Sequence, residues 1–291
     1  MFLLRTLLFV PAVDRRKAEK AFTTEADAVI FDLEDAVAEN QKDAARRAVR
    51  EMLAALSPTR PVFVRVNGPQ SPHILRDLEA VVDLPLEGLM VAKAECGEDV
   101  ARVDWLLSLL EKERGLPMGR LALIPFVESA RGIAKAQEIA AAPRVACLAF
   151  GGNDYLADLG VAYSPEGEEM AHARCQLVVA SRAAGIAPPL DTVNPDFKNI
   201  PALVDDARRA RRLGFGGKLV IHPAQVAPVN EVFTPTREEI AWAREAVEAF
   251  ARAQAAGSAV IQVKGKMVEL PIARRAEQVL AAARRLGLLE E

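Results

Sequence analysis

The sequence has few cysteines, few histidines and no excess of either charge, and each shortage excludes a class of protein. Its three cysteines, Cys96, Cys147 and Cys175, form no C-x-x-C pair, so we expect neither a zinc ribbon nor a disulfide scaffold, and a reducing cytoplasm fits. The three histidines are too dispersed for a zinc site. With 37 basic and 40 acidic residues the formal charge is −3, which argues against a nucleic-acid partner.

Long apolar runs are also missing. No segment approaches the roughly 18 uninterrupted apolar residues of a membrane span, so no membrane partner is expected. The apolar opening MFLLRTLLFVPA lacks the charged start of a signal peptide, is interrupted by Arg5 and stops at Pro11. It is better explained as a buried first strand of a cytoplasmic protein.

What is present is the composition of a large globular core, with 51% hydrophobic and 26% charged residues over 291 positions. Short apolar runs alternate with amphipathic stretches that have the i, i+3, i+4 spacing of helices. The expected strands are Thr6–Val10, Ala28–Leu33, Val62–Val66, Gly88–Ala92, Leu121–Val127, Ala146–Phe150, Ile186–Asp191 and Lys218–Ile221. The expected helices include Gln41–Leu56, Glu98–Arg114, Arg131–Ala141, Pro165–Ala184 and Pro201–Leu213.

About eight such units predict an α/β fold of the (β/α)8 TIM-barrel type. The competing architecture is a doubly wound open sheet, which needs a glycine-rich turn after its first strand; the chain instead has VPAVDRR. We therefore expect a catalytic barrel over residues 1–230.

Residues 231–291 are expected to form a C-terminal helical and hairpin extension. A helix over Thr236–Ala255 follows a start signal, an alternating segment over Ala259–Leu270 turns at Gly265, and a last helix over Ile272–Leu286 precedes Gly287. Since these elements lie outside the eight repeats, we expect them to pack on the barrel or on a neighbouring subunit.

Ionisable side chains stand at nearly every strand end, where the active site of a barrel lies. They are Asp32, Glu34, Asp35, Arg65, Lys93, Glu128, Asp154, Asp191 and His222, and the uncharged amide of Asn67 follows one of the same strands. Any one of them is equally well explained as a helix cap. Their convergence on one rim is harder to explain in that way.

Two carboxylates on neighbouring strands, Glu128 and Asp154, can reach one ion, and Mg²⁺ typically takes one or two protein carboxylates. His222 is as well explained by structural hydrogen bonding as by catalysis. A Schiff-base aldolase using Lys93 or Lys218 is the competing chemistry. Neither a G-x-S-x-G elbow nor a Walker A motif is present, since Leu219 follows the Gly-Lys pair of GFGGKL.

A series of motifs carries a family resemblance over almost the whole chain. They are LRTLLFVPAVDRRKAEKA, ADAVIFDLEDAVAENQKDAAR, FVRVNG, LIPFVESARGI, LAFGGNDYLADLG, SPEGEEMAHARCQLVVASRAAGI, GGKLVIHPAQVAPVNEVFTPT and KGKMVELPIARRAEQVL. In this order they resemble the citrate lyase beta subunit and malyl-CoA lyase group of the HpcH/HpaI aldolase superfamily.

The resemblance implies a Mg²⁺-dependent barrel that makes or cleaves a carbon–carbon bond between an acyl-thioester enolate and a 2-oxo acid. It assigns Glu128 and Asp154 to the metal, in agreement with their positions, and Arg65 to the substrate. It implies that Glu34 and Asp35 orient metal-bound waters. Arg5 and the cluster Arg15, Arg16 and Lys17 fall where family members hold the thioester carrier and its phosphates. The family also implies a homo-oligomer, a trimer or a multiple of one.

Two positions depart from the family pattern. GKMVE places Glu269 where several members have an aspartate that reaches the neighbouring subunit's site as catalytic acid/base. Three outcomes stay open: Glu269 serves with a shifted geometry, the role has moved, or it has lapsed. GGND has Asn153 where members often have an acid, which alters the local charge more than the ligand set.

The sequence thus predicts a carbon–carbon lyase that cleaves a citryl-, malyl- or citramalyl-thioester, on CoA or an acyl-carrier protein, to an acetyl thioester and a 2-oxo acid. Arg65 and the metal would stabilise the enolate. The alternatives are an acyl-CoA thioesterase, a malate-synthase-like condensing activity at the same site, and a non-catalytic subunit of a larger complex. Which thioester is used is not decided by the sequence.

Overall fold

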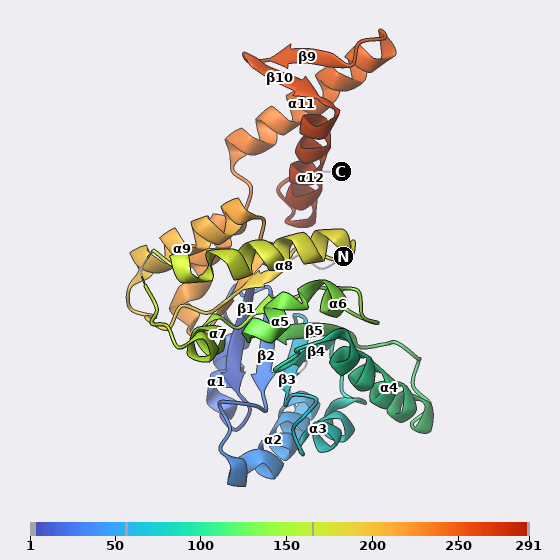
Figure 1. The fold of residues 1–291 in the computed structure, drawn as a ribbon, viewed down its shortest axis with the longest axis vertical. Coiled ribbons are helices and arrows are strands. Elements are labelled where there is room, and N and C mark those ends of the chain that lie inside the picture. The colour runs from blue at the N-terminus through green and yellow to red at the C-terminus, as the bar shows by residue number, and fades with distance from the viewer. Residues whose placement is uncertain (1–3, 56–57, 165, 290–291) are drawn as a thin grey trace. The chain divides into compact units, whose positions relative to one another are not determined.

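The structure is a computed structural model that describes residues 4–55, 58–164 and 166–289. The chain divides into two compact units, Met1–Glu231 and Val232–Glu291. Figure 1 shows the elements of both units, and each unit is described separately below.

The first unit is built on eight parallel strands that close into a barrel in the order β1 to β8. The strands are β1 (Thr6–Pro11), β2 (Ala28–Asp32), β3 (Val62–Val66), β4 (Gly88–Val91), β5 (Ala122–Val127), β6 (Ala149–Phe150), β7 (Leu190–Asp191) and β8 (Gly217–Val220). Closure is made by β1 and β8, with Leu7 paired to Leu219. The predicted (β/α)8 barrel is therefore confirmed, and the open doubly wound sheet is excluded.

Alternation along the strands divides their side chains between two environments. Leu7, Ala28, Phe63 and Leu219 belong to one buried apolar cluster that draws on most of the strands, as expected of a packed barrel interior. Their neighbours Leu8, Val29 and Val64 are equally buried. Strands buried on both faces require a complete cover of helices.

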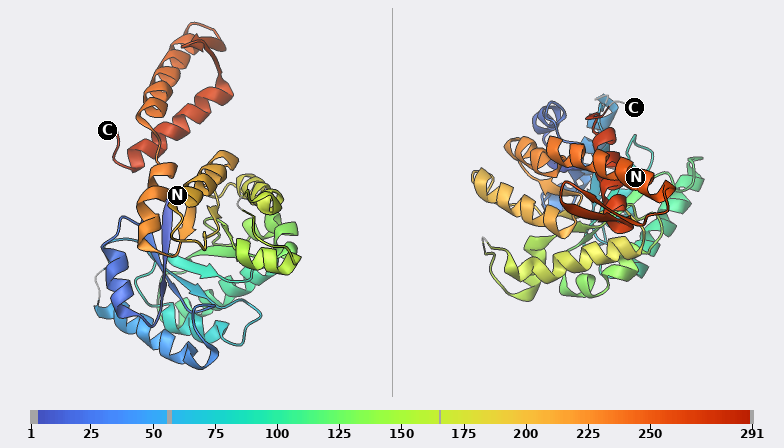
Figure 2. Two further views of the ribbon diagram at one scale, coloured as in Figure 1. Left: turned by 90° about the vertical axis from the view of Figure 1, so that its left-hand side faces the viewer. Right: turned by 90° about the horizontal axis from the view of Figure 1, so that it is seen from above.

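That cover comes from the helices that follow the strands. They are α1 (Arg15–Phe22), α2 (Lys42–Ala55), α3 (Ile74–Val81), α4 (Gly97–Glu113), α5 (Ala130–Ala134), α6 (Ala136–Ala140), α7 (Gly152–Leu159), α8 (Ala171–Ala183), α9 (Ile200–Leu213) and α10 (Val226–Phe233). Short 3-10 turns lie at Glu39–Gln41, Glu168–Met170 and Pro223–Gln225. The two views in Figure 2 show helices of this unit lying outside the strands.

Two expected helices are wrong in their extent. The helix expected over Arg131–Ala141 is two short helices separated at Lys135, whose φ of −108° and ψ of 16° are not helical. Both halves keep the same buried face, which is why periodicity does not detect the break. The helix expected from Pro165 begins only at Ala171, because Gly167 has a left-handed φ of 63°; Pro165 itself lies outside the described residues.

Smaller differences concern element ends. The expected helix Gln41–Leu56 begins one residue later, after a 3-10 turn, and Leu56 lies outside the described residues. Strands β6 and β7 are two residues long, much shorter than expected. Before β7 stand Pro188 and Pro189, which have no N–H to donate to a ladder.

The second unit has its own core. It contains α11 (Arg237–Ala255), a hairpin of β9 (Val260–Val263) and β10 (Lys266–Glu269), and α12 (Leu270–Arg285). The Thr236 hydroxyl accepts from the Glu239 N–H in a capping box that starts α11. Buried side chains of all four elements, Phe250, Val263, Val268 and Leu280 among them, pack together. The expected helix–hairpin–helix order is present, and Figures 1 and 2 show the hairpin at one end of the helix pair.

In the part of the chain that the structure describes, none of the helices combines the length and apolar character needed to cross a membrane.

Candidate active site

The carboxyl ends of β2 and β3 hold an arginine in a fixed orientation. Asp32 and Arg65 are register partners on these strands. Arg65 donates from Nε and Nη2 to the two Asp32 oxygens at 2.8 and 2.6 Å. Its guanidinium also lies over the rings of Phe9 and Phe126, at 4.9 and 5.6 Å from their centroids. The ion pair and the two rings hold the guanidinium in place, and Nη1 is its one nitrogen that Asp32 does not bind.

Arg65 keeps its charge in spite of being buried. Burial by itself lowers its pKa, but the hydrogen bonds and charge of Asp32, followed by the charges of Glu34 and Glu128, outweigh burial and raise the pKa. Nη1 faces two further acids, Glu34 at 3.3 Å and Asp35 at 3.8 Å. A permanent cation next to a cavity can stabilise negative charge that develops on a substrate.

Glu34 and Asp35 follow β2 and lie between Arg65 and Lys93. The Lys93 ammonium is 2.6 Å from Glu34 Oε1 and 3.4 Å from Asp35 Oδ1. Burial raises the pKa of Glu34, although Arg65 and Lys93 oppose the effect. Burial also acts to raise the pKa of Asp35, but the hydrogen bond from Glu34 and the charges of Arg65 and Lys93 lower it overall. The two adjacent acids thus have different affinities for a proton.

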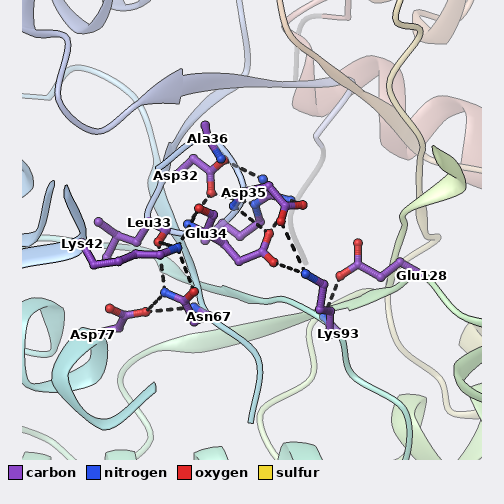
Figure 3. Close-up of polar contacts among 11 residues, drawn as sticks. Asp32, Leu33, Glu34, Asp35, Ala36, Lys42, Asn67, Asp77, Lys93 and Glu128 are labelled. Atoms are coloured by element: carbon purple, nitrogen blue, oxygen red, sulfur yellow. Dashed lines mark hydrogen bonds and ion pairs between the residues drawn. The ribbon is translucent and has the colours of Figure 1, made fainter. Parts of the chain in front are cut away.

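A buried polar network supports the loop that carries these acids, as Figure 3 shows. The Lys42 ammonium donates to the carbonyls of Leu33 and Glu34 at 2.9 and 2.8 Å and to Asn67 Oδ1 at 3.0 Å. Asn67 in turn donates its backbone and side-chain N–H groups to Asp77 Oδ2. Sequence reasoning missed Lys42 and Asp77, since polar residues of amphipathic helices are ordinarily on the surface.

Glu128 follows β5 and is almost fully buried, with 3% of its surface exposed. Its Oε1 accepts from the Lys93 backbone N–H at 2.7 Å, whereas its buried Oε2 has no hydrogen-bond partner among the described residues. Burial, and then the negative charge of Asp154, raises the pKa of Glu128 to about 9. An orphaned buried carboxylate oxygen next to a second carboxylate is the environment in which a cation would be stabilised.

Asp154 lies in the first turn of α7, directly after β6, and is partly exposed. Gly151 and Gly152 bring this turn close to its neighbours. A Cβ at Gly151 would lie 2.4 Å from Glu128 Cβ and 2.8 Å from Glu128 Oε2, so only glycine allows the present approach. The Gly152 N–H donates to the Thr192 hydroxyl at 2.9 Å, which ties the turn to the end of β7.

A cavity of about 420 Å³ lies at the carboxyl ends of the strands, next to these groups, and some of them line it. Its polar lining includes Asp32, Asp35, Arg65, Asn153 and Asp154. Its apolar lining is formed by Phe9, Val10, Pro11, Phe126, Val193 and Ile221. A concave site with a few convergent charged groups and displaced pKa values is the expected form of an enzyme active site.

The donor set is suitable for a hard divalent cation. In the described part of the chain no group of three or more His, Cys, Asp or Glu side chains is placed to hold a metal by itself. Two carboxylates, Glu128 with an Oε2 that has no hydrogen-bond partner among the described residues and Asp154 whose charge acts on Glu128, match the one or two protein ligands of Mg²⁺, which completes its shell with water and substrate oxygens. The residues therefore fit the predicted ion.

The basic residues predicted to hold the thioester lie at opposite ends of β1. Arg5 precedes β1 and so lies at the amino end of the barrel, about 16 Å of strand away from the cavity, where it pairs with Asp27 at 2.6 Å. Arg15, Arg16 and Lys17 form the exposed first turn of α1, at the carboxyl end of β1 and thus on the side of the cavity.

Glu269 belongs to the second unit. It ends β10 and precedes α12, is partly exposed, and makes no side-chain capping bond. Because the two units are described separately, the predicted catalytic role of Glu269 stays a prediction.

His222 and Lys218, which were also considered for catalysis, have structural partners. His222 Nδ1 accepts from the Ala224 N–H at 3.1 Å, and its ring stacks on Phe197. The fully buried Lys218 ammonium binds Asp191 and Asp206, each at 2.6 Å. Burial alone lowers the pKa of Lys93, but Glu34 and then Asp35 raise it overall, whereas a Schiff-base lysine needs a neutral amine. These contacts disfavour the Schiff-base alternative.

Fold and site together define a (β/α)8-barrel enzyme whose acidic, arginine-containing site lies at the strand carboxyl ends. The family model for HpcH/HpaI aldolase/citrate lyase matches residues 5–223, and the chain belongs to this family. The predicted family is confirmed, and with it the class of carbon–carbon lyase.

Curated relatives match along nearly the whole chain. Citrate lyase subunit beta of Escherichia coli strain K12 is 38% identical over 289 residues, covering 99% of this chain and 95% of the relative. The mitochondrial citramalyl-CoA lyase of Homo sapiens is 34% identical over 295 residues, covering 96% and 85%. Both relatives are named as lyases, but of different substrates.

A solved structure is similar over the same length. The CitE protein of Mycobacterium tuberculosis, crystallised with magnesium, acetoacetate and coenzyme A, has 32% identity and a TM-score of 0.79, covering 97% of this chain and 98% of that one. Further crystals of that protein hold magnesium with pyruvate and magnesium with oxaloacetate.

Proposed function

We propose that this chain is a Mg²⁺-dependent carbon–carbon lyase that cleaves a short 3-hydroxyacyl thioester into an acetyl thioester and a 2-oxo acid. The observation that carries the proposal is the pair Glu128 and Asp154: Glu128 has a buried oxygen without a hydrogen-bond partner among the described residues, and Asp154 lines a cavity that Arg65, which keeps its charge, also lines. The ligands of the related CitE protein, magnesium with coenzyme A and a small oxo acid, support the same chemistry.

In this proposal Glu128 and Asp154 hold the ion. When bound, Mg²⁺ supplies Lewis acidity to the oxygens of the hydroxyl and the adjacent carboxylate of the substrate. Asn153 also lines the cavity and leaves the two carboxylates with one neighbouring acid fewer than members of the family often have. Ionisation of Glu128 is needed before it can act as a ligand, because its pKa is raised to about 9 in the structure without a cation.

Arg65 is proposed to stabilise the thioester enolate that forms as the carbon–carbon bond breaks. Its bidentate contact with Asp32 fixes the plane of the guanidinium, and Nη1 has the longer contacts to Glu34 and Asp35. The donor is therefore oriented before negative charge develops, which is the arrangement that lowers a barrier electrostatically. Glu34 and Asp35 are proposed to orient water at the site.

The thioester arm is proposed to cross the exposed first turn of α1. Arg15, Arg16 and Lys17 offer three cations at the carboxyl end of β1, and the cavity begins at the same strand end. Arg5 takes no part in this proposal, because it is at the opposite end of β1. Whether the arm belongs to CoA or to a carrier protein is left to the assay.

A base must remove the hydroxyl proton of the substrate, and an acid must give a proton to the enolate carbon to form the acetyl thioester. We propose Glu269 as this acid/base, taking the first proton and returning it to the enolate, supplied by the second unit of a neighbouring subunit in a homo-oligomer, with trimers as the family's pattern. A cytoplasmic location is part of the same proposal, since the reaction consumes thioesters.

The test is a coupled assay of the purified chain with Mg²⁺ and malyl-, citramalyl- and citryl-CoA, in which acetyl-CoA and the 2-oxo acid are both measured. Metal-dependent release of both products is expected from one of the three. Glu128→Ala should lower kcat/KM by at least about 10²-fold, whereas Glu138→Ala, on the exposed face of α6, should leave it unchanged.

Two results would contradict the proposal. Free CoA without a 2-oxo acid would indicate a thioesterase. Inactivity with all three CoA thioesters and with their acyl-carrier forms would indicate a non-catalytic subunit.

A further inference from the structure

Lys93 has a backbone conformation that few residues of its type adopt. It stands two residues beyond β4 with a φ of 53°, in the left-handed region where residues other than glycine are uncommon. The amides on either side of it continue the barrel ladder, from Ala92 to the Val66 carbonyl and from Ala94 to the Phe126 carbonyl, each at 3.2 Å. The left-handed turn takes the Lys93 N–H out of that ladder.

The displaced N–H is directed at Glu128. It donates to Oε1 at 2.7 Å, so one oxygen is held by the backbone and the other, Oε2, is left without a partner among the described residues. Gly151 packs against Cβ and Oε2 of the same side chain. Two contacts therefore set the orientation of Glu128: the Lys93 N–H holds Oε1, and Gly151, which has no Cβ, leaves room for Oε2.

The side chain of Lys93 reaches the other half of the site. Figure 3 shows it between Glu128 and the loop of Glu34 and Asp35. The ammonium binds Glu34 Oε1 at 2.6 Å, while the other oxygen of Glu34 is 3.3 Å from Arg65 Nη1. Lys93 and Arg65 thus share one carboxylate through its two different oxygens, and the shorter contact is with Lys93.

Stability alone does not explain these features. The Lys93 side chain is 53% exposed, and an ion pair at such a position contributes little to folding. Glycine would adopt the same φ without steric cost. Strained backbone at a site is a reason to look for a functional role.

We propose that Lys93 is a positioning residue for the proposed lyase reaction. Its left-handed N–H aims Glu128, and its ammonium holds Glu34 in the shorter contact, so that the contact of Glu34 with Arg65 Nη1 stays at 3.3 Å and this donor stays available to the substrate. The role of the ammonium, which is tested by kinetics, rests on the proposed function. The role of the N–H is tested by metal affinity and needs no substrate.

Four variants separate the backbone from the ammonium. Lys93→Met and Lys93→Ile both remove the charge, but only isoleucine is β-branched and opposes the left-handed conformation. Lys93→Gly removes the charge and accepts the conformation freely. Lys93→Arg keeps the charge. Thermal unfolding of each variant establishes that it is folded.

The first measurement is the affinity for Mn²⁺, used as a paramagnetic probe of the magnesium site, by electron spin resonance titration. The N–H is aimed correctly in the Met and Gly variants, so their dissociation constants should stay within about threefold of the unsubstituted chain. Lys93→Ile should bind about 10- to 100-fold more weakly. Equal affinities for Met and Ile would overturn the backbone role.

The second measurement is steady-state kinetics on the thioester that the unsubstituted chain cleaves. Lys93→Met and Lys93→Gly should lose about 10- to 100-fold in kcat with little change in KM, and Lys93→Arg should recover most of the loss. In Lys93→Met, the further change Glu34→Gln should cost much less than it does alone, because both act through Arg65. Additive losses would overturn the ammonium role.

The two proposals fail in different ways. If the unsubstituted chain cleaves no thioester, the proposed function fails, while the order of Mn²⁺ affinities still decides whether the Lys93 N–H aims Glu128. If the chain is active and Lys93→Met retains its kcat, only the role of the ammonium is lost. If the unsubstituted chain binds no Mn²⁺, the magnesium site and the backbone role of Lys93 are both rejected.

Discussion

At the scale of single residues, the central feature is a carboxyl group that holds its proton more tightly than usual. Burial and the nearby charge of Asp154 raise the pKa of Glu128 from 4.5 to about 9. Near neutral pH the metal-free side chain is therefore mostly protonated. Cation binding must release that proton, which couples metal affinity to pH.

We expect the affinity for Mg²⁺ to increase with pH by about tenfold per unit up to about pH 9, because one proton leaves Glu128 for each ion bound. The stability of the metal-free fold changes with pH in the opposite direction. A carboxyl whose pKa is raised in the folded state stabilises the fold at low pH, and this contribution is lost as pH rises from about 5 to about 9. Calorimetric titration and thermal unfolding of the metal-free chain measure the two effects.

Glu128→Gln is the control for both measurements, since it keeps the shape of the side chain and removes its titration. It should bind Mg²⁺ weakly at every pH, and its unfolding temperature should decline less between pH 5 and pH 9. A pH-independent affinity in the unsubstituted chain would show that Glu128 is not the linked group.

Which residues lie in the site could be inferred from the sequence only in part. Glu128 and Asp154 were expected together because each follows a strand, and the charge of Asp154 does raise the pKa of Glu128. Arg5 was expected near the thioester from the resemblance alone, and the structure places it before β1, at the amino end of the barrel, where it pairs with Asp27. Lys42 was missed because its burial depends on packing between α2 and the loop after β2.

At the scale of elements, a neutral cluster of four buried charges joins two helices to two strands. Arg174 of α8 makes a bidentate contact with Asp191 of β7 and reaches Asp206 of α9 at 2.8 Å. Lys218 of β8 binds both aspartates. The next residue, Leu219, belongs to the apolar cluster of the barrel interior. Because side chains alternate along a strand, Lys218 lies on the helix side of β8.

Lys218→Met should destabilise the chain by about 3–5 kcal/mol, because two buried aspartates would lose the fully buried cation that binds both of them. Chemical denaturation measures this change. Lys198→Met, at an exposed position before α9, is the control and should change stability by less than about 0.5 kcal/mol.

The same variant addresses the Schiff-base alternative. Reduction with borohydride in the presence of a 2-oxo acid should leave the unsubstituted chain unmodified. A covalent adduct that disappears in Lys218→Met would contradict the structural role given to this lysine.

The first and last residues of a helix could be predicted only where neighbouring residues in the sequence carry a signal for them. The capping box at Thr236 begins α11 where the sequence indicated, because the signal is contained in four residues. The break at Lys135 and the late start of α8 had no such signal in hydrophobic periodicity, which is insensitive to one non-helical residue when both sides keep the same buried face.

At the scale of the whole molecule, each of the two units has a core of its own, and they are joined within α10. The second unit carries Glu269 at the junction of β10 and α12. If this residue serves the barrel of a neighbouring copy, one active site needs two chains.

That proposal predicts complementation between inactive variants. Glu128→Ala and Glu269→Ala should each be inactive alone, and their co-expression should restore activity at about a quarter of the sites in a randomly mixed oligomer. Assays of the co-purified mixture, alongside each variant alone and a sedimentation measurement of assembly, test it. A mixture as inactive as its components would confine Glu269 to its own chain or remove it from the site.

The sequence by itself determined the closed barrel, the family and the class of chemistry, because strand period, helix period and the residues at strand ends are local features that recur eight times. Only the tertiary structure decided that one Glu128 oxygen has no hydrogen-bond partner in the described part of the chain, that Lys93 is left-handed, and that Lys42 and Lys218 are buried. These properties arise from the burial and charge of groups distant in the chain. A pattern of neighbouring residues carries no record of them.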